Sequence, residues 1–266
     1  MVNRLSGFLS LRPALALALG IVAGCATPPS ASDFDATVEY QHANDPAEPA
    51  NRNIFEGNRA VDRVLLKPAA EGYHVLPQPM RDGVHSFLTN WQELLVFVHD
   101  LLQGELACAG ETLIRFLTNT TIGFLGVGDV ASEGLGLYHH DEDMGQTLAA
   151  WGINEGPYVM LPLLGPSNAR DTVGRVVDFF IDPIGFTMPL PLAATVGKMA
   201  MGGVDQRERH LEALDDVERT SIDFYASIRT LYRQRRAEEI RNGAMLQENG
   251  MIYEVEYPRT LGMSLP

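Results

Sequence analysis

The chain has 266 residues, 45% of them hydrophobic and 20% charged, which is enough apolar material for one large domain or two small ones. Its formal net charge is −14 at pH 7, from 20 Lys and Arg against 34 Asp and Glu. This balance argues against a nucleic-acid-binding protein, because phosphate recognition needs a basic surface, and it gives no general attraction to anionic lipid surfaces. Any membrane contact must then be apolar or covalent.

The first 24 residues have the pattern of a signal peptide. Arg4 and Arg12 are the only charged residues before Asp33, and residues 14–23 form an apolar run too short to cross a bilayer. The run ends in VAGC at residues 22–25, which resembles the bacterial lipobox. We predict cleavage before Cys25, a diacylglyceryl group on its thiol and a further acyl chain on its new amine, which together give a lasting anchor. The alternative is an ordinary secretory signal that is cut elsewhere.

Residues 25–44 are predicted to be the acylated cysteine and a flexible tether, because they hold several Pro and Ser residues and little that could pack. Ala26 follows the cysteine, whereas in bacterial lipoproteins an aspartate there tends to retain the protein at the inner membrane. Its absence favours the outer membrane. The other cysteine, Cys108, lies among small residues and is predicted to be a buried structural thiol.

From residue 45 to residue 241 the periodicity is helical, and the expected body is all-α. The predicted helices cover residues 84–102 with Gly104 as the C-cap, residues 105–119, residues 146–151, a helix capped by Ser167 that ends near Ile181, and a long amphipathic helix over residues 211–241. Residues 242–266 form a C-terminal tail, in which the sequence IYEVEY at residues 252–257 is the best strand candidate.

Three segments that are apolar, rich in Gly and Pro and nearly uncharged interrupt these helices. They cover residues 120–137, residues 156–167 and residues 183–204. Connections in a water-soluble helical protein are usually polar, so these segments suggest surfaces for lipid or for a membrane partner. The alternative is that they fold inward and fill the core, and the pattern does not decide between the two.

The patterns of an enzyme are weak in this chain. The best metal candidate is HHDED at residues 139–143, but contiguous donors cannot all reach one ion, so a solvated acidic loop is predicted and no metal. There is no GxSxG motif and no dinucleotide-binding pattern after a strand. We therefore predict no catalysis and no cofactor other than the acyl groups on Cys25.

Several long motifs resemble one family. They are DPAEPANRNIFEGNRA from Asp45, RFLTNTTIG at residues 115–123, GQTLAAWG at residues 145–152, GPYVMLPLLGPS at residues 156–167 and RDTVG at residues 170–174. Over roughly residues 45–183 the chain is similar to the MlaA (VacJ) family of outer-membrane lipoproteins. One departure is Asp143-Met144-Gly145, where Asp-Phe-Gly is expected.

The resemblance implies a flat, ring-like helical assembly that lies in the periplasmic leaflet of the outer membrane and has a central channel. It also implies removal of mislocalised phospholipids from the outer leaflet, association with a porin trimer, and transfer to a periplasmic carrier protein, which together maintain lipid asymmetry. The alternatives to this function are a periplasmic-face phospholipid hydrolase and a purely structural porin-binding lipoprotein. We expect the lipid pathway to include Tyr158, Val159, Met160, Leu161, Leu163, Leu164 and Gly165. Arg115 and Arg170 are candidate headgroup contacts, with structural ion pairs as the alternative.

Overall fold

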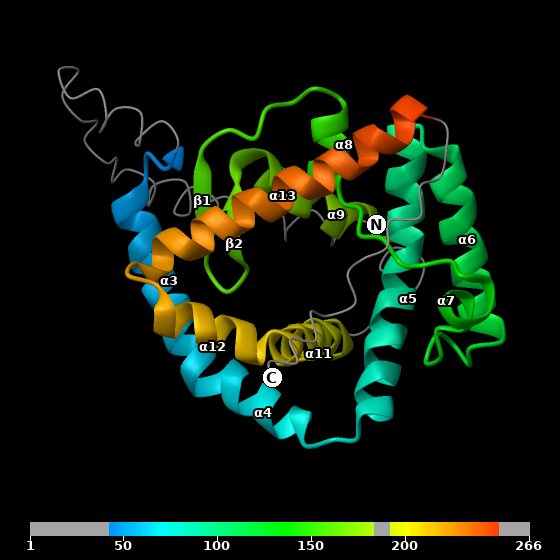
Figure 1. Cartoon of the computed structure of the whole chain (residues 1–266), viewed down its shortest axis with the longest axis horizontal. Coiled ribbons are helices and arrows are strands. Elements are labelled where there is room, and N and C mark those ends of the chain that lie inside the picture. Colours follow the sequence, from blue (N-terminus) through cyan, green and yellow to red (C-terminus); the bar gives the residue numbers. More distant parts are fainter. Residues whose placement is uncertain (1–42, 184–191, 250–266) are drawn as a thin grey trace, which may run out of the picture.

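The computed structural model describes residues 43–183 and 192–249, in which helices predominate and the strands form one hairpin. Figure 1 shows the helices arranged as a flat ring viewed down its shortest axis, which confirms the predicted all-α, ring-like fold. No helix in the described ranges combines the length and the apolarity needed to cross a membrane. The predicted signal peptide, Cys25, nearly all of the tether and the strand candidate at residues 252–257 lie outside the described residues.

The left and lower rim of the ring in Figure 1 is a nearly continuous helical rod. It consists of α3 (Glu48–Val61), the π-helix η2 (Asp62–Leu66) and α4 (Lys67–His74). Pro68 lies in the first turn of α4 and cannot donate a hydrogen bond to the preceding turn, and the wider π-turn accommodates it there. The sequence pattern predicts that the folded part starts near Asp45, but it predicts no helix in this stretch.

Two antiparallel helices form the right side of the ring. α5 (Gln78–Gln103) begins six residues before the predicted start at Val84, and it ends as predicted at Gly104, whose φ of 85° is the left-handed conformation of a C-cap. α6 (Leu106–Thr121) agrees with its prediction to within two residues. The apolar segment at residues 120–137 continues as turns and the short helix α7 (Val130–Leu135), which the Asp129 side chain caps.

The apolar segment at residues 156–167 was expected to be an irregular connection, and this expectation is wrong. The segment forms most of an antiparallel hairpin between α8 (Met144–Ala150) and α9 (Ala169–Ile181). The strands are β1 (Tyr158–Leu161) and β2 (Gly165–Asn168). Pro166 in β2 is paired with Met160, whose N–H points away from β2 and donates to Asn51 of α3. This pair therefore exchanges no hydrogen bonds between the strands, and the missing N–H of Pro166 costs none. Asn168, not the predicted Ser167, caps α9, because its side chain accepts a hydrogen bond from the Asp171 amide.

The remaining helices complete the ring and correct two predictions. α11 (Leu192–Arg209) shows that much of the segment at residues 183–204 is helical and not an irregular connection. The predicted long helix at residues 211–241 is two helices, α12 (Leu211–Thr220) and α13 (Phe224–Asn249), and α13 crosses the upper part of the ring. The chain breaks there because Ser221 is extended and the Asp223 side chain accepts a hydrogen bond from the Ala226 amide.

The burial pattern of the described residues is the reverse of that in most soluble proteins. More polar and charged side chains than apolar ones are buried, whereas large apolar side chains are exposed on η2, α5, α6, α7, α9 and α11 and in several of the connecting loops. The apolar core is small and consists mainly of Phe55, Tyr158, Met160 and Tyr225, which join α3, β1 and α13. Directional polar bonds must therefore provide much of the cohesion between the helices.

Candidate functional site: a ring with a polar interior and an apolar rim

The hairpin is held to α3 by two asparagines that lie two helical turns apart. Asn51 donates to Tyr158 O (3.2 Å) and accepts from Met160 N (2.9 Å), so it satisfies the outer edge of β1 as a neighbouring strand would. Asn58 donates to Leu161 O (2.9 Å) and accepts from Leu163 N (2.8 Å). The seven-residue spacing puts both side chains on one face of α3, and this arrangement fixes the hairpin relative to the rim.

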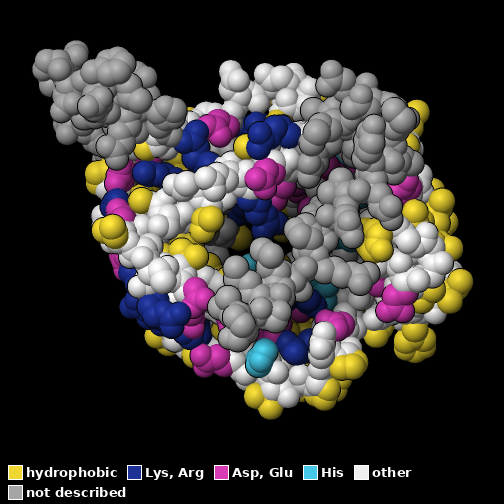
Figure 2. Space-filling model, viewed as in Figure 1, with side chains coloured by type: hydrophobic (Ala, Val, Ile, Leu, Met, Phe, Trp, Pro, Cys, Tyr) yellow, Lys and Arg dark blue, Asp and Glu magenta, His cyan; other side chains and the backbone are white. Residues whose placement is uncertain are grey.

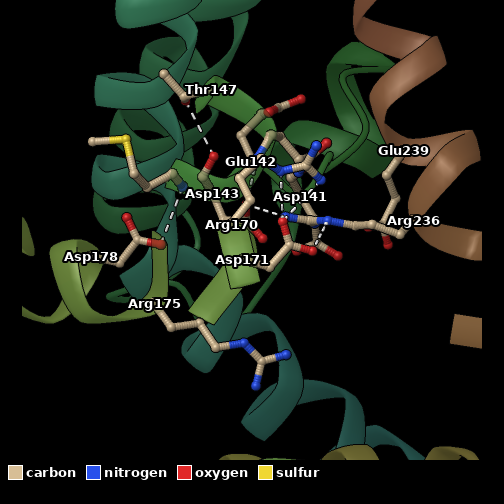
Figure 3. A network of polar contacts seen from close by, with 12 residues as sticks. Asp141, Glu142, Asp143, Thr147, Arg170, Asp171, Arg175, Asp178, Arg236 and Glu239 are labelled. Carbon is tan, nitrogen blue, oxygen red and sulfur yellow. Dashed lines mark hydrogen bonds and ion pairs between the residues drawn. The ribbon is translucent and has the colours of Figure 1, made fainter. Parts of the chain in front are cut away.

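The network drawn in Figure 3 fastens α13 to α8 and α9. Arg236 lies 2.6 Å from Asp143 Oδ1 and 2.8 Å from Asp171 Oδ2, and the Tyr232 hydroxyl donates to the same Asp171 oxygen at 2.6 Å. Burial opposes the ionisation of Asp171, but Arg236 and the Tyr232 hydroxyl outweigh it and lower the pKa of the carboxyl group. Asp171 is therefore a buried anion at the junction of three helices.

Glycine is required beside this network. A Cβ atom on Gly145 would lie 2.4 Å from an Arg236 nitrogen and 2.5 Å from Asp171 Oδ1. A Cβ atom on Gly174 would lie 2.6 Å from the Gly145 nitrogen. These close approaches explain Gly145 of the GQTLAAWG motif and Gly174 of the RDTVG motif, which allow α8 and α9 to pack backbone against backbone.

Two buried carboxylates on α5 hold the loop at residues 137–143, which we call the histidine strap. Glu93 is 1% exposed and Asp100 is fully buried, and they lie two turns apart on one face of α5. Arg115 of α6 donates from Nε to Glu93 at 2.8 Å, and Thr112 donates to Asp100 at 2.7 Å. The histidine strap supplies a second partner to each of these two carboxylates.

His139 Nδ1 lies 3.2 Å from Glu93 Oε1, and His140 Nε2 lies 3.1 Å from Asp100 Oδ1. Burial lowers the pKa of His139, but its bonds with Asp141 and Glu93 outweigh burial and raise the pKa to about 9. Burial also raises the pKa of Glu142 to about 7. The predicted solvated acidic loop is therefore wrong, because the strap binds α5 and α6.

The opposite side of the ring is closed by acidic residues of α11. Asp205 lies 2.8 Å from His85 Nδ1 and accepts a hydrogen bond from the Tyr73 hydroxyl at 3.2 Å. Glu208 binds His74 and Arg81, and Arg207 donates to Asp62 at 2.8 Å. These bonds connect α4, α5 and η2 through α11.

The outer surface has the opposite character. Figure 2 shows apolar side chains gathered along the edge of the ring, over α6 and α7 and at the turn between α4 and α5. We define the apolar rim as the exposed apolar side chains of α6 and the loop that follows it: Leu106, Leu113, Ile114, Leu117, Ile122, Phe124 and Leu125. The centre of the same face is hollowed in Figure 2, and Lys and Arg side chains border the hollow.

The loop after α6 carries backbone strain. Phe124 and Leu125 have φ angles of 54° and 61°, a left-handed conformation that costs about 1–2 kcal/mol per residue outside glycine. Their side chains are nevertheless among the most exposed of the large apolar ones, with Phe124 79% exposed. A strained backbone that presents two apolar side chains outward is typical of a contact with lipid or with another apolar surface.

The MlaA lipoprotein family model matches residues 43–239, which is most of the chain. The chain belongs to the MlaA lipoprotein family. It is 33% identical over 243 residues to the "Intermembrane phospholipid transport system lipoprotein MlaA" of Escherichia coli K12, covering 89% of this chain and 91% of that one. A relative of the same description from Haemophilus influenzae is 29% identical over 215 residues, covering 79% and 85%.

A solved MlaA-like structure agrees with the fold. It is described as "Structural basis for maintenance of bacterial outer membrane lipid asymmetry", and it matches with a TM-score of 0.66 at 30% identity, covering 74% of this chain and 98% of that chain. An uncharacterised protein of Rickettsia typhi is 35% identical over 196 residues, covering 73% of this chain and 77% of that one. The MlaA resemblance drawn from the motifs is thereby confirmed.

The hairpin residues predicted for a lipid pathway in this MlaA-family chain separate into two groups. Tyr158 and Met160 are buried in the apolar core. Val159, Leu161 and Gly165 are half-buried, and Leu163 and Leu164 are exposed at the hairpin tip. The alternation of a strand explains the division, because successive side chains of β1 point to opposite faces.

The two candidate headgroup arginines are buried among internal partners. Arg115 binds Glu93, and Arg170 donates from Nε to Asp171 at 3.0 Å. Their surroundings correspond to the structural ion pairs that the sequence left as the alternative. Cys108 is half-buried and not fully buried, and burial raises its pKa to about 12, as expected of an unreactive thiol.

The roles of Glu93, Asp100 and Arg236 were not predicted from the sequence, and neither was the bonding of Asn51 to the hairpin. Their partners lie far away in the chain, and only the spacing of Asn51 and Asn58, or of Glu93 and Asp100, hinted at a shared helix face. No group of His, Cys, Asp and Glu in the described ranges is arranged to hold a metal ion.

Proposed function

We propose that this lipoprotein removes mislocalised phospholipids from the outer leaflet of the outer membrane and passes them to a periplasmic carrier protein. In this proposal the acyl chains on Cys25 and the apolar rim hold the ring in the periplasmic leaflet, beside a porin trimer. The observation that supports it most is the reversed burial pattern: polar side chains join the helices inside the ring and apolar side chains cover its edge. The relatives named for intermembrane phospholipid transport support the same function.

The medium around the protein determines which side chains can be exposed at its surface. A protein in one leaflet has acyl chains around its edge, so exposing apolar side chains there carries no free-energy penalty of the kind that water imposes. Its polar groups find no partners among acyl chains and must be bonded inside the protein. A diacyl molecule that crosses the leaflet needs a passage that accepts both a headgroup and acyl chains. The hollowed centre, bordered by charged side chains, and the exposed Leu163 and Leu164 of the hairpin tip provide these two surfaces.

The apolar rim can be tested separately from folding. Replacing Phe124 and Leu125 by Asp removes two apolar contacts, and Asp tolerates the left-handed backbone better than either residue. We expect the double variant F124D/L125D to be at least as stable as the wild-type protein in detergent. In cells that lack the native protein, we expect it to leave phospholipid in the outer leaflet, measured by labelling of surface-exposed amines and by detergent sensitivity.

The matched control is Asn53→Asp, which adds a carboxylate at an exposed polar position of α3 and should support normal transport. Full transport by F124D/L125D would contradict insertion of the apolar rim. Release of lysophospholipid or fatty acid by the purified wild-type protein would support the hydrolase instead. Porin co-purification with no change in lipid distribution on deletion would support a purely structural role.

A further inference from the structure

Arg175 differs from almost every other cation in the described ranges. Its guanidinium donates from Nη1 to Leu164 O at 3.1 Å and from Nη2 to Pro166 O at 3.3 Å, and no carboxylate of the described residues lies within ion-pair distance. The other Lys and Arg residues in those ranges have a carboxylate within 4.0 Å, with Arg241 of α13 as the one exception. Arg175 is thus a cation placed by two carbonyls and neutralised by no described side chain.

The neighbouring acids of α9 are already engaged. Asp171 lies one turn before Arg175 and is bound by Arg236, and Asp178 lies about one turn after it and accepts from His99 Nε2 at 2.9 Å. Figure 3 shows the Arg175 side chain directed away from the network around Asp171 and Arg236. Its remaining N–H groups are Nε–H and one on each Nη nitrogen, so they stay available to a ligand.

The surface beside Arg175 is apolar. One face of α9 exposes Val173, Val176, Phe179 and Phe180, and the hairpin tip exposes Leu163 and Leu164. Arg175 stands at the border of this apolar face, with Phe179 one helical turn away and the carbonyl of Leu164 on its guanidinium. The place therefore combines a fixed cation with apolar surface, which are the two chemistries that a phospholipid requires.

We propose that Arg175 binds the phosphate group of a phospholipid whose acyl chains lie on the exposed apolar face of α9. The inference rests on the proposed transport function and adds the residue that recognises the headgroup. The planar guanidinium suits the bidentate geometry of a phosphodiester, and the carbonyls of Leu164 and Pro166 orient it before the lipid arrives. Binding would also couple lipid occupancy to the hairpin tip, because the same side chain touches both.

The test uses the full-length protein with a photoreactive residue at Val176, incubated with vesicles of radiolabelled phosphatidylglycerol or with radiolabelled diacylglycerol. We expect Arg175→Gln to reduce crosslinking to phosphatidylglycerol about tenfold, because a charge-assisted bond is lost, and to leave diacylglycerol crosslinking unchanged. Arg175→Lys should retain part of the signal. Arg241→Gln removes the other cation that has no ion pair among the described residues. Arg241 lies on α13, and this variant should crosslink as the wild-type protein does.

The outcomes separate the two proposals. Wild-type protein that crosslinks to neither lipid would contradict the transport function and this inference with it. Equal crosslinking of Arg175→Gln and wild-type protein to phosphatidylglycerol would overturn the inference alone. An equal loss for both lipids would show that Arg175 only fastens the hairpin. Complete competition by millimolar inorganic phosphate would assign the site to the free ion and not to a lipid.

Discussion

Gly174 of α9 faces Gly145 of α8 so closely that a Cβ atom on Gly174 would lie 2.6 Å from the Gly145 nitrogen. The neighbouring atoms are backbone and cannot rotate away. We therefore expect Gly174→Ala to lower the free energy of unfolding by about 1–3 kcal/mol, as overpacking does, measured by denaturant titration in detergent. Gly57→Ala on α3 is the control, because a Cβ atom there meets nothing within 4 Å and should stabilise by up to about 1 kcal/mol.

Asn51 is expected to be essential for the hairpin. Asn51→Ala leaves the carbonyl of Tyr158 and the N–H of Met160 without partners in a buried place, which should cost about 2–4 kcal/mol. Hydrogen exchange at the Met160 amide should accelerate more than exchange in α5. Asn53→Ala, on the exposed side of the same helix, should change neither quantity, and similar effects of the two substitutions would contradict the edge-strand role of Asn51.

Arg236 and its neighbour Arg235 offer a matched pair on α13. Arg236→Gln removes one of the two cations that bind the buried carboxylate of Asp171 and leaves Arg170 as the other, so we expect a loss of about 3 kcal/mol and faster hydrogen exchange in the second half of α13. Arg235 forms an exposed ion pair with Glu239, so Arg235→Gln should cost at most about 0.5 kcal/mol. Equal losses would mean that the network does not hold α13.

The histidine strap makes stability depend on pH. The pKa of His139 is about 9 in the folded chain against an ordinary value of 6.5, so its stabilising contribution is complete below about pH 6.5 and disappears as the pH rises through 9. The pKa of Glu142 is raised to about 7 from 4.5, so its effect also lowers stability as the pH rises, but over the lower pH range from about 4.5 to 7. We expect the free energy of unfolding to fall between pH 5 and pH 9.

His139→Gln should remove the upper part of that slope, up to about 3 kcal/mol between pH 6.5 and pH 9, in denaturant titrations repeated across the range. His210→Gln is the control, because His210 is exposed and its one hydrogen bond among the described residues is to the Gln206 carbonyl. A variant slope identical to the wild-type slope would show that the strap does not carry the pH dependence.

The sequence predicted those features that neighbouring residues determine. Gly104 ends α5 because its left-handed conformation is a local property, and the period of the apolar positions located α6. The break between α12 and α13 was missed because the same period continues across Ser221, so only the extended backbone and the Asp223 cap interrupt it.

Features that depend on distant partners could not be predicted in this way. The hairpin contains prolines and glycines that weaken a strand, and its edge is completed by Asn51 and Asn58, about a hundred residues earlier in the chain. The surroundings of Arg115 likewise depend on Glu93 in another helix. The ring and the family were predicted from the resemblance of the motifs, because neither periodicity nor composition determines how the helices are arranged in space.

The prevalence of polar bonds over apolar contacts inside the ring has a consequence for how the protein tolerates its surroundings. Hydrophobic cohesion weakens when acyl chains replace water, because nothing is then gained by hiding oily groups, whereas hydrogen bonds and ion pairs strengthen as the local dielectric constant falls. If the ring enters a leaflet as proposed, bonds such as Glu93–Arg115 and Asp171–Arg236 should therefore tighten when it passes from water into the bilayer. The shape of the ring would then be most rigid at its destination and most compliant on the way there.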